Sequence, residues 1–258
     1  MSEKKIFKEY MEISPFASVE ISAQDIAKIA VLNDFKTYIQ DKKNKIGQVN
    51  EKTKKKFKKH NLDYDKWLNY AKTSTITLDD RKYNIKLWDR YPQKDLFMGN
   101  RTSCCTAIID GGNGNATPIY LANTAFNVVE LTDENGDIIA MSRIFTGNVN
   151  KKPSMIIENI EVNNAFLKSR TKDDLTEIRN SMFEYIKNFA NEISNNQEME
   201  IYFSQNYTHV PMDDYVAKEE VIDFIGSISS EKIYINSKPG WVAPKELKDE
   251  ACSLYKIV

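Results

Sequence analysis

The chain has 258 residues, with 36 Lys plus Arg against 37 Asp plus Glu, a formal net charge of −1 and 41% hydrophobic residues. This balance creates no overall field that attracts nucleic acid or a membrane, so neither is expected as a partner. No apolar run is long enough to span a bilayer, and the first residues lack the apolar segment of a signal peptide, so we expect a cytoplasmic protein. Three cysteines and two histidines predict neither a disulfide framework nor a zinc site.

Residues 1–72 read as a helical N-terminal region. Ser22 and Asp25 form a capping-box pair ahead of apolar residues at helical spacing. Six of the eight residues from Lys52 to Lys59 are lysine. This run is either a patch that binds nucleic acid or an acidic partner or, as we favour, a solvated helix face followed by a connector. A protein partner bound through this region is therefore one possibility.

From residue 73 onward the hydrophobic period changes to two, which is typical of strands. Apolar residues alternate on both sides of Asp79-Asp80-Arg81 and predict a hairpin. A second hairpin joins Phe126–Thr132 to Asp137–Phe145 through a turn that contains Asn135-Gly136, the strongest short hairpin signal. A third apolar strand is predicted at Ser154–Val162.

A long amphipathic helix follows, with Thr171 and Asp174 as a capping box. The next strand is Glu198–Phe203, and the order strand, helix, strand implies a right-handed parallel crossover. We then expect a helix over Tyr215–Ile225 and strands at Glu231–Asn236 and Ser253–Val258. Residues 73–258 are thus predicted to form an α+β domain: a mixed, mostly antiparallel sheet with flanking helices.

Two adjacent cysteines, Cys104 and Cys105, follow Thr102 and Ser103, either of which can cap a short helix. A thiol in the first turn of a helix sees the positive end of the helix dipole, which favours the reactive thiolate. The alternative is packing, because cysteine is among the most buried residue types.

A basic loop stands before the long helix and holds Lys168, Arg170 and Lys172. Cations beside the unbonded amides of a helix N-terminus at Thr171 would make an anion site suited to a pyrophosphate. The alternative is a solvated surface loop.

The element order with this basic loop resembles the GNAT superfamily of acyl-CoA-dependent N-acyltransferases over roughly residues 75–258. Three local stretches are similar to GNAT-like domains of phage and mobile-element proteins: Gly99-Asn-Arg-Thr-Ser-Cys-Cys105, Ile139-Ala-Met-Ser-Arg143 and Ile157-Glu-Asn-Ile-Glu161. The resemblance implies an acetyl-CoA or other acyl-CoA donor. Its pantetheine would bind free main-chain groups of Ile160 and Val162 where the third strand splays from Glu198–Phe203.

The resemblance further implies that the pyrophosphate lies at Thr171. The corresponding loop in the family carries glycines, whereas residues 168–173 of this chain contain none, so the side chains of Lys168, Arg170 and Lys172 would have to substitute for glycine amides.

The chemistry of such a transferase needs a base and an acid. Glu158 and Glu161 are candidate bases, and their spacing predicts that they point to opposite faces of the strand. Tyr207 or Tyr255 would be the acid.

Two other readings stay open. One is a cysteine hydrolase or transferase in which Cys104 or Cys105 acts with His209 and with Asp213 or Asp214. The other is a non-catalytic GNAT-like module that binds a protein.

Overall fold

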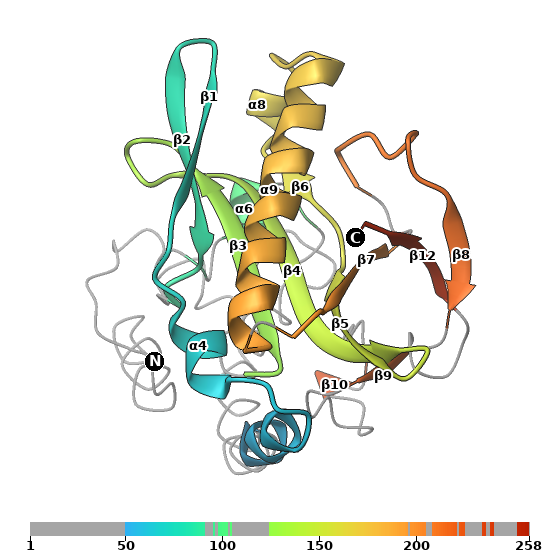
Figure 1. Ribbon diagram of the computed structural model, residues 1–258. Helices are drawn as coiled ribbons and strands as arrows, with labels where there is room; N and C mark the ends of the chain where they lie inside the picture. The colour runs from blue at the N-terminus through green and yellow to red at the C-terminus, as the bar shows by residue number, and fades with distance from the viewer. Residues whose placement is uncertain are drawn as a thin grey trace.

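A ten-stranded mixed sheet organises the part of the chain that the structure describes (Figure 1). The computed structural model describes residues 50–90, 95, 98–102, 104, 124–195, 197–204, 208–220, 222–224, 234–235, 238–239 and 252–257. The path through the sheet is β1-β2-β3-β4-β5-β7-β12-β8, and β6 and β9 both pair with β4. The strands of this sheet are β1 Ser74–Leu78, β2 Arg81–Leu87, β3 Phe126–Thr132, β4 Ile138–Val149, β5 Lys152–Ile157, β6 Glu161–Val162, β7 Glu200–Ser204, β8 Ala217–Glu220, β9 Ile222–Phe224 and β12 Cys252–Lys256.

The strand pairs described in this sheet are antiparallel except that of β5 with β7, which is parallel. The crossover between these two strands contains α8 (Asn164–Leu167) and α9 (Lys172–Ile193). The predicted α+β class, with its mostly antiparallel mixed sheet and parallel crossover, is therefore confirmed. Two further strands, β10 (Tyr234–Ile235) and β11 (Lys238–Pro239), form a separate pair.

Both predicted hairpins are present, and their turns follow from local chemistry. Between β1 and β2, Asp79 and Asp80 take positive φ values of 48° and 60°, a conformation that aspartate tolerates better than most residues. Between β3 and β4, Gly136 has φ 80°, and the Asp133 carboxylate accepts hydrogen bonds from the main-chain N–H groups of Asn135 and Asp137.

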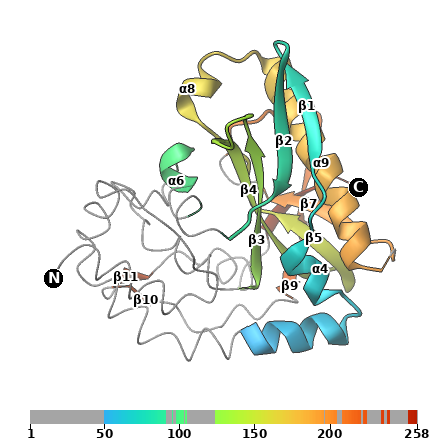
Figure 2. The ribbon, with the colours of Figure 1, turned by 90° about the vertical axis from the view of Figure 1, so that its left-hand side faces the viewer.

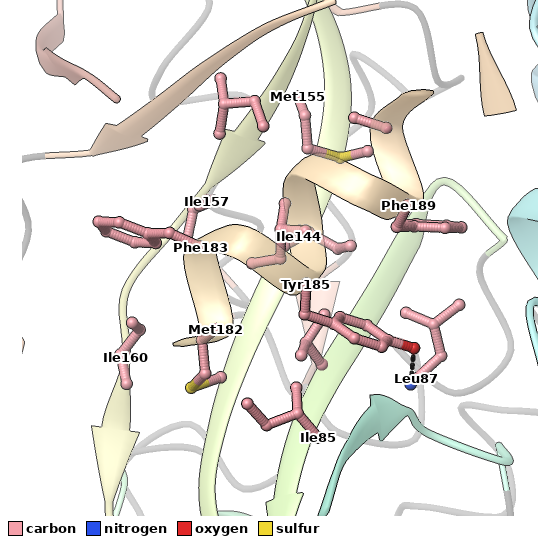
Figure 3. Close-up of a cluster of buried hydrophobic side chains, with 14 of the residues drawn as sticks. Ile85, Leu87, Ile144, Met155, Ile157, Ile160, Met182, Phe183, Tyr185 and Phe189 are labelled. Atoms are coloured by element: carbon pink, nitrogen blue, oxygen red, sulfur yellow. Dashed lines mark hydrogen bonds between the residues drawn. The ribbon is translucent and has the colours of Figure 1, made fainter. Parts of the chain in front are cut away.

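Helix α9 covers one face of the sheet with the predicted apolar stripe (Figures 1 and 3). Its capping box forms as expected, since Thr171 and Asp174 bond each other's main-chain N–H groups. Tyr185 Oη accepts a hydrogen bond from the main-chain N–H of Leu87 at 2.9 Å, which ties the helix to β2 (Figure 3). The buried residues of this stripe are Ile178, Met182, Phe183, Tyr185, Ile186, Phe189, Ala190 and Ile193.

The described end of the N-terminal region shares this core. A helix over residues 50–59 and α4 (Tyr64–Asn69) bring Phe57 and Trp67 into the cluster that α9 buries. Trp67 stacks on Phe189, with ring centroids 5.6 Å apart. Residues 1–49 lie outside the described part, so the capping pair at Ser22 stays a prediction. The domain boundary at residues 72/73 also stays a prediction.

Two predicted elements are wrong. The segment predicted as a helix over Tyr215–Ile225 contains β8 and β9, which pair with β12 and β4. Strand pairing supplied by distant residues here overrides local helix propensity. The strand predicted at Ser154–Val162 is instead divided into β5 and β6. Of Glu231–Asn236 only β10 is described, and the last strand lies at Cys252–Lys256 as expected.

Among the described residues, no helix is both long enough and apolar enough to cross a bilayer.

Candidate functional site

A buried arginine on β4 is the centre of the most polar part of the described interior. Ile144 belongs to the core under α9, so alternation along β4 places Arg143 on the opposite face of the sheet. Its side chain is 2% exposed. Nε of Arg143 donates to Glu158 Oε2 at 2.5 Å, and Nη2 lies 3.9 Å from Glu161 Oε1.

A β-bulge brings the two glutamates to the same face. Ile157 pairs with Ile144, and Glu161 pairs with Met141. Three residue steps on β4 therefore oppose four on the partner, which inserts one extra residue. The prediction that Glu158 and Glu161 face opposite sides is consequently wrong, because it assumed an unbroken strand.

Glu161 has a mixed set of neighbours. Asn159 Nδ2 donates to its Oε1 at 2.8 Å, Thr102 Oγ1 lies 3.4 Å from its Oε2, and the Cys104 thiol hydrogen-bonds the same side chain. Burial raises the pKa of Glu161 to about 7, against the opposing effect of Arg143. This carboxyl group therefore titrates near neutral pH. Burial also raises the pKa of Glu158, and the charge of Arg143 opposes that rise.

Two acceptor atoms in this cluster have no hydrogen-bond partner among the described residues. They are Oε1 of Glu158 and Oδ1 of Asn159, on residues that are 2% and 7% exposed. A buried acceptor without a partner costs about 1–3 kcal/mol, so such atoms often mark the place of a ligand or an ordered water. We call Thr102, Cys104, Arg143, Glu158, Asn159 and Glu161 the Arg143 cluster.

Cys104 reaches this cluster from α6 (Met98–Arg101), which lies on the side of the sheet opposite α9 (Figure 2). The described residues place Cys104 beyond the end of this helix, not in the first turn of a helix capped by Thr102 or Ser103. Thr102 Oγ1 instead donates to Met98 O at the C-terminus of α6. The helix-dipole argument for a reactive thiolate is therefore wrong for Cys104. The thiol contacts the Glu161 carboxyl group instead. Cys105 and Tyr207 lie outside the described residues.

The parallel ladder of β5 and β7 ends at the pair Ile157 and Phe203. Beyond it, residues 208–210, which we call the 208–210 segment, take the place beside the bulge. Thr208 Oγ1 donates to Ile160 O at 3.0 Å and lies 3.3 Å from Ile160 N, and the main-chain N–H of His209 donates to Ile160 O at 3.0 Å.

Val162 is bonded in the same way, because its N–H donates to His209 Nδ1 at 2.9 Å. The main-chain groups of Ile160 and Val162 expected to be free for pantetheine are thus bonded within the chain.

The basic loop before α9 is also paired. Arg170 bonds Asp79 of the β1–β2 turn and lies over the Phe166 ring, with 4.2 Å from its guanidinium carbon to the ring centroid. Lys172 Nζ donates to Asp213 at 2.6 Å. Asp173 and Asp174 add negative charge to the first turn, and the capping box uses the helix-terminal amides. Lys168 is exposed, and the expected anion site is not preorganised.

Tyr255 is not near the two glutamates. It lies on β12, packs partly against the core under α9, and its ring centroid is 6.4 Å from that of Phe203. Glu158 and Glu161 lie on the other face of the sheet, so this tyrosine is unsuited to protonate a group that Glu161 activates.

The cysteine, histidine and aspartate of the hydrolase reading have separate partners. Asp214 accepts two hydrogen bonds from Arg179 of α9, at 2.6 and 2.7 Å, and the guanidinium lowers the pKa of this carboxyl. Asp213 bonds Lys172 and His209 bonds Val162, whereas the Cys104 thiol lies with Glu161 on the face away from α9. The described residues therefore do not assemble a catalytic triad around Cys104.

Sequence reasoning assigned no role to Arg143 or Asn159, although a charged residue between apolar neighbours in the middle of a predicted strand was visible in Ile139-Ala-Met-Ser-Arg143. The described residues hold no group of three or more His, Cys, Asp or Glu that could bind a metal ion. Comparison of this chain with protein-family models, curated proteins and solved structures finds no match.

Proposed function

We propose that this chain is a GNAT-like N-acyltransferase that moves an acyl group from acyl-CoA to an amine of a protein or small molecule. One observation carries the proposal: the parallel ladder of the crossover ends at Ile157 and Phe203, and Glu161, with a pKa of about 7, lies directly beyond that end. Strands that stop pairing offer main-chain donors and acceptors to an extended ligand.

Glu161 is the base in this reaction. A carboxyl group with a pKa near 7 is substantially ionised at neutral pH and is still basic enough to take a proton from an attacking amine. The amine nitrogen bonds to the thioester carbonyl carbon, the carbon–sulfur bond breaks, and the CoA thiolate leaves. Arg143 acts as a positioning residue, since it holds Glu158 and lies close to Glu161.

Donor binding requires the 208–210 segment to separate from the bulge. Pantetheine would replace Thr208 and His209 as the hydrogen-bond partner of Ile160 and Val162. A neutral hydrogen bond contributes about 0.5–1.5 kcal/mol, so removing the His209 side chain should tighten acyl-CoA binding by roughly 2- to 10-fold.

The pyrophosphate would compete for Arg170 and Lys172 with Asp79 and Asp213. The Lys172–Asp213 pair is exposed and therefore weak, and the Asp79 carboxylate is 68% exposed although the Arg170 side chain is only 7% exposed. An anion with several acceptor oxygens can displace a single carboxylate from each of them. Asp79→Asn should therefore favour the donor by releasing Arg170.

Calorimetric titration with acetyl-CoA and with free CoA tests the proposal. We expect saturable binding by the unmodified protein, tighter binding by His209→Ala and weaker binding by Arg170→Glu. Ser181→Ala, at a half-buried position of α9 away from the basic loop, is the matched control and should bind as the unmodified protein does. Absence of binding to the unmodified protein, His209→Ala and Asp79→Asn alike would exclude an acyl-CoA site.

The bonded state of Ile160, Val162, Arg170 and Lys172 also favours a second candidate, a non-catalytic GNAT-like module whose donor site is permanently closed. Such a module would bind neither acetyl-CoA nor CoA in any of these variants. A protein partner captured by it should be lost on deletion of residues 1–49, which leaves Phe57 and Trp67 of the core in the chain.

A further inference from the structure

The Arg143 cluster contains a nucleophile that direct transfer to an amine does not use. Cys104 is buried, and its main-chain N–H donates to Gly99 O at 2.8 Å, which fixes the chain just beyond α6. Its thiol hydrogen-bonds Glu161, and Thr102 Oγ1 lies 3.4 Å from Oε2 of the same carboxyl group. Two side chains from one end of α6 therefore converge on one carboxylate.

A second observation points to a ligand beside this thiol. Oε1 of Glu158 and Oδ1 of Asn159 are buried acceptors without a hydrogen-bond partner among the described residues. Asn159 is joined to Glu161 through its Nδ2, and Glu158 is joined to Arg143 through its Oε2. The vacant acceptor capacity thus lies next to the Cys104–Glu161 pair, where the N–H groups of an incoming amine would satisfy it.

We propose that Cys104 carries the acyl group as a covalent thioester between acyl-CoA and the amine, with Glu161 as its base. This inference rests on the proposed acyltransferase function and changes its mechanism from direct transfer to two half-reactions.

In the first half-reaction, the Glu161 carboxylate takes the proton from the Cys104 thiol, and Sγ attacks the carbonyl carbon of the CoA thioester. The carbon–sulfur bond to CoA breaks, and the leaving CoA thiolate takes the proton from Glu161. This half-reaction exchanges one thioester for another, so no oxidant or reductant is required.

In the second half-reaction, the amine nitrogen attacks the acyl carbon on Cys104 while one of the acceptors, Glu158 Oε1 or Asn159 Oδ1, binds the hydrogen that stays on the nitrogen. The carbon–sulfur bond to Sγ breaks, and the amine proton passes through Glu161 to the Cys104 thiolate. The products are the amide, free CoA and the original thiol. Burial of Cys104 protects the acyl-enzyme from hydrolysis.

Isotope exchange tests the first half-reaction without any knowledge of the amine. The full chain is incubated with acetyl-CoA and isotopically labelled CoA in the absence of an acceptor, and label entering acetyl-CoA is measured. We expect exchange, together with a gain of one acetyl group in the intact mass that hydroxylamine removes and that peptide mapping places on Cys104.

Cys104→Ser and Cys104→Ala should abolish exchange, and Glu161→Gln should slow it by about 100-fold or more while retaining acetyl-CoA binding. Ser181→Ala on α9 is the control and should exchange normally. Saturable acetyl-CoA binding without exchange or acetylation, or acetylation only at another cysteine, would overturn the role of Cys104 and leave direct transfer intact. Absence of acetyl-CoA binding would overturn both proposals.

Discussion

The two faces of the central sheet are built from the same strands but hold opposite chemistries. Facing α9, hydrocarbon and aromatic side chains dominate, among them Ile144, Ile157 and Phe203. Facing α6, neighbouring positions on those strands hold Arg143 and Glu158, beside a smaller apolar cluster that includes Phe145 and Ile156. The apolar face depends on packing, whereas the charged face depends on every ionic group keeping its partner. The two faces should therefore respond differently to substitution and to pH.

The largest expected effect is on the charged face. Arg143→Met leaves Glu158 buried without its ion-pair partner, which should lower the free energy of unfolding by about 3–5 kcal/mol. Denaturant titration measures the loss. The double variant Arg143→Met/Glu158→Leu should recover much of it, because it removes both charges of the close pair. A double variant no more stable than the single one would show that the pair is not the source of the effect.

A substitution on the apolar face should cost nearly as much for a different reason. Ile144→Ala removes buried methyl groups under α9 and leaves a cavity, with an expected loss of about 2–5 kcal/mol. Because no charge is involved, the loss should be the same at about pH 5 and about pH 8. A loss that grows with pH would mean that the two faces are energetically coupled.

Glu161→Gln should change how the free energy of unfolding depends on pH, which Ile144→Ala on the apolar face should not. The raised pKa means that the folded chain holds a proton that the unfolded chain releases above about pH 4.5, so stability falls as pH rises through 7. A rise from 4.5 to about 7 corresponds to roughly 3 kcal/mol at full ionisation.

The Gln variant should lack this decline and be the more stable protein at about pH 8. Thermal unfolding at several pH values is the measurement. Glu134→Gln, in the exposed β3–β4 turn, is the control and should follow the parent chain.

The smallest expected effect concerns the start of α9. Thr171→Ala removes the capping hydrogen bond to the Asp174 main-chain N–H and should cost about 1 kcal/mol, while Thr171→Ser should retain most of it. Urea titration compares the two. An equal loss in both would mean that the hydroxyl group does not cap the helix.

Part of the candidate site was readable from the sequence and part was not. Glu158 and Glu161 were recognised because a carboxylate between isoleucines of a strand is costly to bury and therefore suggests a functional role. Their common face was not recognised, because one extra residue at the bulge reverses the side of every later side chain. The partners of Arg170 and Lys172 come from Asp79 and Asp213, which lie far away in the chain, and local pattern holds no information on them.

By itself, the sequence determined both hairpins, the capped apolar helix and the parallel crossover, because turn residues, capping pairs and hydrophobic periods act over a few neighbouring positions. Tertiary structure alone decided that Arg143 lies beside two glutamates and that Cys104 contacts Glu161. It also decided that Thr208 and His209 hydrogen-bond the main-chain groups of Ile160 and Val162. These contacts depend on strand register and on which segment lies beside the end of the parallel ladder. Register and segment placement are set by the packing of the whole sheet.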